Sequence, residues 1–164
     1  MGDRIKHTRR LGKKTIARQQ LEDSIELFLE HRFVSSLTLA GAAEELLKQL
    51  LHSRGLLSTA DDEVAMRHYM RLLAGKPSVT DSYLYSSIYE GRNHAKHHTP
   101  KKPEVNAFSP FSEAFMMLQR AMFDAKRLGL RISNGARYQS WYEQTILSKL
   151  KVQPEVSASG RSSD

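Results

Sequence analysis

The apolar residues of this chain recur with the period of an α-helix from residue 15 to residue 150. In residues 15–31, Leu21, Ile25 and Phe28 follow one another at i, i+4 and i+7, while the acidic residues lie mostly on the other faces. Residues 33–54 carry one apolar stripe and a second row that widens it, and a glycine follows at the usual position for a C-terminal stop. The members of these rows are Leu39, Ala43, Leu46, Leu50, Ala40, Leu47 and Leu51. We expect two helices here, of which the second is the most deeply buried.

Capping signals predict where the next two helices begin. Ser58 and the acids that follow it are typical of a helix N-terminus, because a hydroxyl and negative charges satisfy the free N–H groups there. The helix that they open carries Met66, Tyr69, Met70 and Leu73 and ends near Gly75; its methionines are interpreted as packing filler. Thr80 or Asp81 begins another helix, which holds Leu84 and Ile88. Since Pro100 disfavours helical geometry at Thr99, that helix is expected to end near His97 or His98.

The last third of the chain predicts two more helices. Ser109 and Pro110 form a cap followed by proline at the first helical position. The stripe after them is the clearest in the protein and ends at Gly129; it consists of Phe111, Ala114, Phe115, Leu118, Ala121, Met122 and Ala125. A final helix is expected from about Ala136 to Leu150.

These patterns predict a single all-α bundle of five or six helices over residues 15–150. Alternating β-branched runs and Asp-Gly turns are absent from the sequence, and Asn134-Gly135 has no alternating runs on either side with which to form a hairpin. We expect a core built from Leu39, Ala43, Leu46, Leu50, Phe115, Leu118 and Met122. Residues 1–14 are expected to form a basic disordered arm and residues 151–164 a disordered tail.

Composition narrows the class of protein. The absence of cysteine excludes disulfides and thiolate metal sites. No apolar run approaches the ~20 residues that a membrane span needs, so we expect a cytoplasmic protein without a membrane partner. The net charge of +7 is concentrated in residues 1–18, where seven Lys or Arg residues, Arg9 and Arg10 among them, stand against Asp3 alone. Such an arm indicates a nucleic acid or an acidic partner, or else a solvated leader that aids solubility.

The segment Arg92–His98 concentrates the side chains that are best suited to phosphate binding and proton transfer. It combines Arg92, Asn93 and Lys96 with three histidines, and Lys101 and Lys102 follow it. A guanidinium binds a phosphate through paired donors, and an imidazole transfers protons near neutral pH. His97 and His98 could instead only complement the negative end of the helix dipole. His94 and His98 are spaced to chelate a metal, but no carboxylate joins them, so we expect no metal and no other cofactor.

The second predicted helix carries an acidic pair, Glu44 and Glu45. Of Glu44 and Glu45, one is expected to face solvent and the other to be partly buried. A buried carboxylate needs a partner, for which Lys48 or Arg92 is the expected choice.

Arg92 and Asn93 followed by His97 and His98, together with Glu44 and Lys48 on an earlier helix, resemble the HEPN superfamily. Its ribonucleases are α-helical bundles with an arginine, a polar residue, and a histidine four to six positions after the arginine. The resemblance implies a HEPN-like bundle and a metal-independent endoribonuclease, acting in stress or phage defence. Arg92, Asn93, His97 and His98 would be catalytic, and Glu44 and Lys48 would support them. Lys96, Lys101, Lys102, Arg9 and Arg10 would attract RNA.

Helical geometry argues for two copies of the chain. Arg92 and His97 lie ~140° apart around an ideal helix, so they cannot easily grip one phosphate from a single chain. We therefore expect a homodimer in which the two Arg92–His98 segments face a common groove, as the resemblance also implies.

Two other functions stay open. One is a non-catalytic HEPN-like module that binds RNA, a nucleotide or a protein partner. Asn93, Lys96 and His97 also match a group of small bacterial proteins whose helix ends in Asn-Phe-Phe-Lys-His, and Thr99 or Pro100 stands where many toxin-type members have tyrosine. The other is a structural oligomer whose arm binds nucleic acid nonspecifically.

Overall fold

The structure, a computed structural model, describes residues 10–96 and 109–150, and all of its regular elements are helices. No strand occurs in these two ranges, which confirms the all-α prediction. The elements are α1 (Lys13–Leu29), α2 (Phe33–His52), α3 (Thr59–Leu73), α4 (Asp81–Ile88), α5 (Glu90–Lys96), α6 (Pro110–Arg127), α7 (Gly135–Tyr142), the π-helical segment η1 (Glu143–Leu147) and α8 (Ser148–Leu150). None of the described helices combines the length and apolar character that crossing a bilayer requires.

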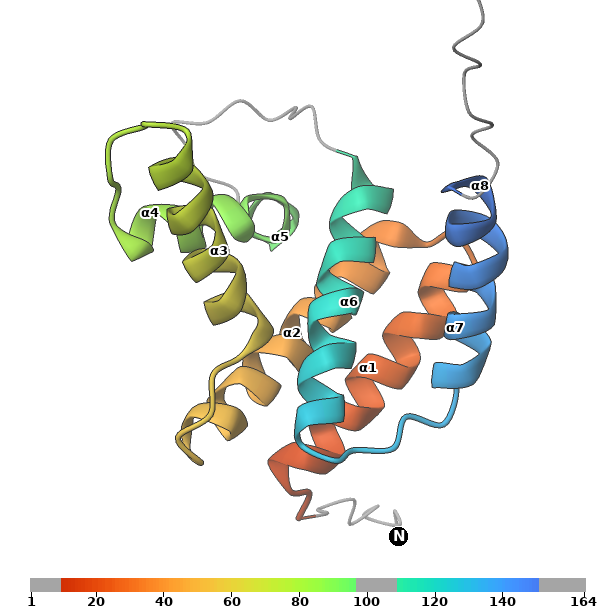
Figure 1. The fold of residues 1–164 in the computed structure, drawn as a ribbon. Helices are drawn as coiled ribbons and strands as arrows, with labels where there is room; N and C mark the ends of the chain where they lie inside the picture. Colours follow the sequence, from red (N-terminus) through yellow and green to blue (C-terminus); the bar gives the residue numbers. More distant parts are fainter. Residues whose placement is uncertain (1–9, 97–108, 151–164) are drawn as a thin grey trace, which may run out of the picture.

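The helices form a main bundle with a smaller lobe beside it. Helix α2 packs along both α1 and α6, and α7 covers α1 on the outer side (Figure 1). Helices α3 and α4 project to the left of this bundle in Figure 1, and α3 meets α6 mainly near its own beginning. Helix α5 lies between lobe and bundle, in contact with α2, α4 and α6. This position places Arg92 against the middle of α2.

The core is centred one residue later along α2 than the sequence suggested. Ala43 and Leu118 are completely buried, as predicted. The other five residues of the predicted core, which are Leu39, Leu46, Leu50, Phe115 and Met122, are only partly buried. The deepest positions of α2 are instead Leu37, Ala40, Ala43, Glu44, Leu47 and Leu51. Because α2 lies between two helices, its buried arc follows their positions, which the stripe alone does not reveal.

The predicted caps are observed. Ser58 and Asp61 form a capping box at α3, and the side chains of Thr80 and Ser109 accept backbone N–H groups at α4 and α6. Gly55, Gly75 and Gly129 have φ of +69°, +61° and +67°, the left-handed conformation that ends helices. His31 has the same conformation after α1, with φ +62°, and no sequence signal predicted it.

Two expected helices differ in detail. The helix expected from Thr80 or Asp81 to His97 or His98 is divided at Tyr89, which leaves helical geometry with φ −101° and ψ 9°. No glycine or proline stands at the break itself, and Gly91, two residues later, is already helical within α5. The final helix contains the π-helical segment η1. His97, His98 and Pro100, and with them the predicted end of the divided helix, lie outside the described residues.

The interpretation of Met66 and Met70 as packing filler is wrong. Their side chains are 59% and 57% exposed. Helix α3 turns Ala60 and Val64 toward the core, and the two methionines lie on the opposite face of the helix.

Candidate functional site around Arg92

Two glycines allow α5 to approach its neighbours closely. A Cβ atom at Gly41 would lie 2.5 Å from Cδ of Arg92, and a Cβ atom at Gly91 would lie 2.3 Å from Cδ of Glu113 on α6. Both distances are far below van der Waals contact. A side chain at residue 41 would displace the middle of the Arg92 side chain, whereas a side chain at residue 91 would require the end of the Glu113 side chain to rotate aside. Arg92 can therefore lay its aliphatic part across α2 only because residue 41 is glycine.

The guanidinium of Arg92 is held at a defined place on α2. Its Nη1 donates to the carbonyl oxygen of Gly41 at 3.4 Å. The same nitrogen lies 3.9 Å from Oε2 of Glu44 and 3.7 Å from Oε2 of Glu45. The guanidinium carbon stands 4.3 Å from the ring centroid of Tyr89, a cation–π geometry. Only 15% of the Arg92 side chain is exposed, so its position is fixed by these contacts.

Glu44 is the buried acid of this site. It is completely buried, whereas Glu45 is about half exposed, which confirms the expectation of one acid outside and one inside. The Tyr89 hydroxyl donates to Oε1 of Glu44 at 2.5 Å. Oε2 has no hydrogen bond among the described residues, and its nearest cation is Arg92. Burial raises the pKa of Glu44, while Tyr89, Arg120 and Arg92 oppose that shift.

Lys48 belongs to a neighbouring cluster instead of pairing with Glu44. Its Nζ stands 4.1 Å from the ring centroid of Tyr85 and 3.9 Å from Oδ1 of Asp61. Asp61 also accepts hydrogen bonds from the Tyr85 hydroxyl, from Ser58 and from Nε2 of His52, the last at 2.6 Å. Burial alone would raise the pKa of Asp61, but these hydrogen bonds outweigh it and hold that pKa below its ordinary value.

Together these contacts make a polar seam along one side of α2. Gly41, Glu44 or Glu45, Lys48 and His52 recur at helical spacing, so they share one face. Side chains from three other helices reach this face of α2: Asp61 from α3, Tyr85 from α4 and Arg92 from α5. The seam thus carries three basic side chains in a row, from Arg92 through Lys48 to His52.

Sequence reasoning missed part of the seam. His52 was not singled out, although it lies four residues after Lys48 and eight after Glu44 on the same face. Tyr85 and Tyr89 also belong to the seam. They are partly or fully buried, and their hydroxyl groups also bind Asp61 and Glu44. Burial raises the pKa of both tyrosines well above the ordinary range, so both act as hydrogen-bond donors.

The remaining predicted site residues are only partly described. Asn93 follows Arg92 on α5 and is exposed. Lys96 is the last described residue of α5. Arg10 is exposed just before α1, whose first turn lies at the lower end of the bundle in Figure 1, away from α5. The structure therefore does not bring Arg10 and Arg92 together. The five other predicted residues lie outside the described residues; they are Arg9, His97, His98, Lys101 and Lys102.

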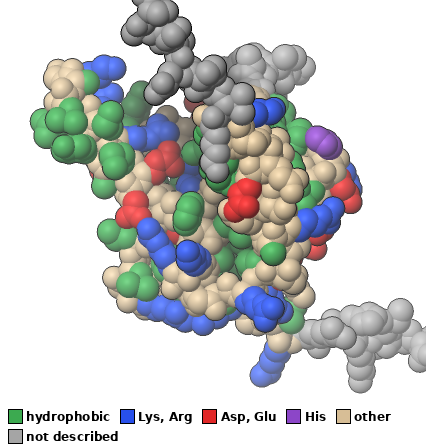
Figure 2. Space-filling model, turned by 45° about the vertical axis from the view of Figure 1, so that its right-hand side comes forward, with side chains coloured by type: hydrophobic (Ala, Val, Ile, Leu, Met, Phe, Trp, Pro, Cys, Tyr) green, Lys and Arg blue, Asp and Glu red, His purple; other side chains and the backbone are tan. Residues whose placement is uncertain are grey.

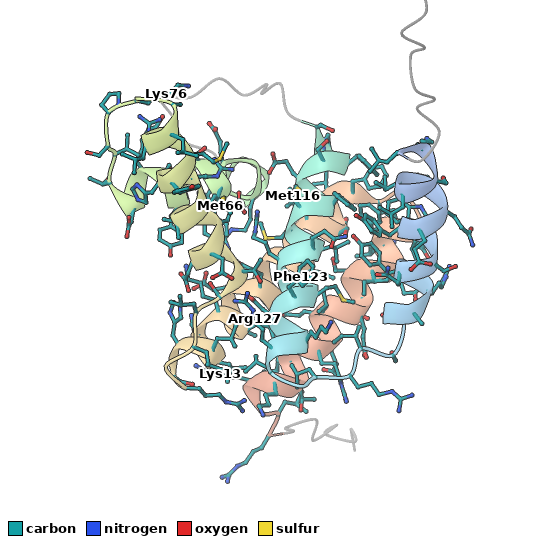
Figure 3. All side chains as sticks on the ribbon, in the orientation of Figure 1. Lys13, Met66, Lys76, Met116, Phe123 and Arg127 are labelled. Atoms are coloured by element: carbon teal, nitrogen blue, oxygen red, sulfur yellow. The ribbon has the colours of Figure 1, made fainter. Side chains whose placement is uncertain are left out.

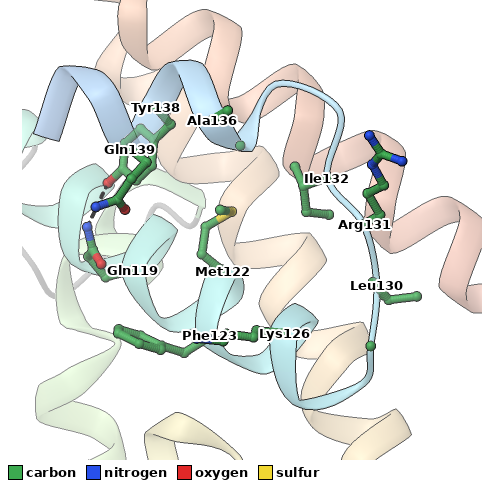
Figure 4. Close-up of a pocket in the computed structure, with 12 residues that line it drawn as sticks. Gln119, Met122, Phe123, Lys126, Leu130, Arg131, Ile132, Ala136, Tyr138 and Gln139 are labelled. Carbon is green, nitrogen blue, oxygen red and sulfur yellow. Dashed lines mark hydrogen bonds between the residues drawn. The ribbon is translucent and has the colours of Figure 1, made fainter.

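A separate pocket of about 510 Å³ lies between α6 and α7 (Figure 4). Its floor includes Met122 and Ile132, and at one end Nε2 of Gln119 donates to the Tyr138 hydroxyl at 3.1 Å. None of the residues that contact Arg92 lines it. The pocket is thus distinct from the seam.

Neither a metal-binding group nor a similar protein identifies the chemistry of the site around Arg92. Among the described residues, no group of three or more His, Cys, Asp or Glu side chains is placed to hold a metal ion. Comparisons of the chain with family models, with curated proteins and with solved structures find no match.

Proposed function

We propose that the protein acts on RNA and cleaves it without a metal ion, as its resemblance to HEPN ribonucleases implies. The observation that carries this proposal is the fixed position of Arg92. Its guanidinium is held on Gly41 and Tyr89, and the exposed Asn93 follows it on α5. A guanidinium whose position is set before the substrate arrives stabilises developing charge without a reorganisation cost.

The proposed reaction uses the 2′-hydroxyl of RNA as the nucleophile. His97 takes the hydroxyl proton, the 2′-oxygen attacks phosphorus, and the 5′-oxygen leaves with a proton from a second imidazole, for which His98 is available. Arg92 stabilises the charge on the phosphorane, and Asn93 orients the phosphate. The products carry 2′,3′-cyclic phosphate and 5′-hydroxyl ends. Lys96, Lys101, Lys102, Arg9 and Arg10 supply general attraction to the RNA backbone.

Glu44 and Glu45 restrict how Arg92 meets a phosphate. Both carboxylates face Nη1, so Nη2 is the donor that Arg92 offers to RNA in this proposal. Since Arg92 and His97 are five residues apart, two copies of the segment would complete one site. A homodimer is therefore part of the proposed function. The cellular role that we propose for the protein is stress or phage defence.

The test is cleavage of a mixed-sequence RNA by the purified protein in EDTA. Arg92→Ala should reduce the cleavage rate about 10²-fold or more, and His97→Ala should do the same, because each removes a group used in the transition state. Arg54→Ala is a matched control, since Arg54 is exposed beyond the end of α2. Equal cleavage by wild type and the Arg92→Ala, His97→Ala double variant would refute the proposal.

A second candidate function is a binding module without catalysis. The observation that favours it is the pairing of Arg92 with two carboxylates, which partly neutralise the guanidinium. A module of this kind would bind RNA, a nucleotide or an acidic partner through the same surface. Wild-type RNA binding that weakens in Arg92→Ala, without cleavage of any RNA by either protein, would support this function over the first.

A further inference from the structure

Helix α3 presents an apolar face to solvent. Met66, Tyr69, Met70 and Leu73 follow the spacing i, i+3, i+4 and i+7, and their exposed fractions are 59%, 56%, 57% and 64%. This is the spacing by which one helix packs against another. In Figure 2, hydrophobic side chains gather at the upper left, where Figure 1 places α3 and α4. The face is therefore built like an interface, yet none of the residues in 10–96 and 109–150 covers it.

The side of α3 toward the protomer explains why this face stays uncovered. Ala60 and Val64 are buried there, and the rest of that side is polar. Arg67 bonds to Glu63, and Arg71 donates to the carbonyl oxygen of Pro77 at 2.7 Å. These polar contacts already hold α3 in place. The apolar stripe on the opposite side is thus free for a partner.

We propose that the partner is a second copy of the chain, with the two α3 helices packed antiparallel about a two-fold axis. The charges along α3 favour this occupant. The exposed Asp62 lies in its first turn, and the exposed Lys76 follows its C-terminal end (Figure 3). An antiparallel pair places the acidic end of each helix beside the basic end of the other, and the two helix dipoles are also opposed.

A two-fold axis through the centre of the stripe sets the register. Tyr69 and Met70 then lie beside the axis, and Met66 of each copy meets Leu73 of the other. In this register Lys76 comes near Asp62 of the second copy, which is 47% exposed and pairs with Arg127 in its own chain. The same surface is used twice, as a closed dimer requires.

The exposed apolar surface is large enough for a dimer. Leu72 follows the stripe on the same helix, with an exposed fraction of 73%. At roughly 200 Å² for a large side chain, five residues about 60% exposed amount to about 600 Å² per copy. This approaches the ~800 Å² that each partner buries in a specific complex of ordinary size. This dimer is held through α3 and is therefore an alternative to the dimer of the proposed function, in which the Arg92–His98 segments face each other. The α3 interface does not depend on RNA cleavage, so RNA cleavage and the α3 dimer can fail separately.

Cross-linking through introduced cysteines tests the register, because the chain contains no cysteine of its own. Met70→Cys should form a covalent dimer under mild oxidation. Met66→Cys alone should not, since its two copies would lie about 10 Å apart along the helices. A mixture of Met66→Cys and Leu73→Cys chains should cross-link. Val34→Cys, at the exposed start of α2, is the control and should stay monomeric on a denaturing gel. Cross-linking of Asn93→Cys but not of Met70→Cys would overturn the proposal and place the α5 segments at the interface instead.

Light scattering of the full-length protein tests the affinity. Wild type should be a dimer at tens of micromolar, and Met70→Lys should raise the dissociation constant at least about tenfold, because it buries a charge at the axis. Val34→Lys should leave the constant unchanged. Circular dichroism should match for all three, since both substituted residues are exposed. A wild-type monomer at these concentrations, or a Met70→Lys dimer as tight as wild type, would overturn the proposal.

Discussion

Replacement of Gly41 by alanine should destabilise the wild-type protein but stabilise a protein in which Arg92 has also been replaced by alanine. In most helices Gly→Ala stabilises, because glycine has more backbone freedom to lose on folding. Here the new methyl group would meet Arg92, with Cδ 2.5 Å and Cγ 3.1 Å away. Both atoms belong to the middle of the side chain, so the guanidinium cannot stay beside Glu44 and Tyr89 while they move aside.

The magnitude follows from two opposing contributions. Overpacking of a buried position costs roughly 1–3 kcal/mol, and the helix preference for alanine returns about 1 kcal/mol. Gly41→Ala should therefore lower the free energy of unfolding by about 1 kcal/mol, within a range of roughly 0–2. In the Arg92→Ala protein the Cγ and Cδ atoms are gone, and the same substitution should raise the free energy of unfolding by about 1 kcal/mol. The coupling energy between the two sites should then be roughly 1–3 kcal/mol.

The assay is urea denaturation followed by circular dichroism for the four proteins of this double-mutant cycle. Ala42→Gly serves as the control, because it changes helix preference at the next position. It should cost about 1 kcal/mol with or without Arg92. In the RNA assay, Gly41→Ala should also reduce cleavage, since it displaces the guanidinium. Equal effects of Gly41→Ala on stability with Arg92 and with alanine at 92 would refute the packing argument.

Two further predictions concern Glu44 and His31. Burial raises the folded-state pKa of Glu44 above its ordinary 4.5. Between the pKa of the unfolded chain and that of the folded protein, folding therefore takes up a proton. Wild type should lose stability relative to Glu44→Gln as the pH rises through this range. Urea midpoints of both proteins from pH 4 to pH 8 check this, and a difference that is constant or changes with the opposite sign would contradict it. His31 adopts φ +62°, which costs a side-chain-bearing residue about 1 kcal/mol, so His31→Gly should raise the melting temperature in calorimetry; a lower value would mean that the ring contact with Phe33 contributes more than the strain costs.

The fold class and most helix ends could be predicted because their causes are local. The hydroxyl of Ser58 and the carboxylate of Asp61 satisfy N–H groups within the same turn, and Gly75 adopts its conformation for lack of a side chain. The break at Tyr89 could not be predicted in this way. It coincides with a hydroxyl contact to Glu44, which lies 45 residues earlier in the chain.

The site was predicted in part. A buried carboxylate needs a cation, and the sequence offers few, so Arg92 and Lys48 were the two partners expected for it. The structure pairs Glu44 with Arg92. The choice between Arg92 and Lys48 depends on which helix lies over Gly41, and only the packing of α5 decides that. His52 and Asp61 are nine residues apart in two helices, so no single helix face unites them. The roles of Arg92 and His97 in RNA cleavage stay predictions.

Helix α3 shows most clearly what the residue spacing determines and what only the tertiary structure determines. The spacing of Met66, Tyr69, Met70 and Leu73 requires an amphipathic helix, because helical geometry alone brings these residues to one face. The pattern does not say what that face meets. The apolar stripe would suit a core, but Ala60 and Val64 on the other side are the residues buried in the protomer. Which side turns inward depends on the contacts of α3 with α4 and α6, and these join parts of the chain that are distant in sequence.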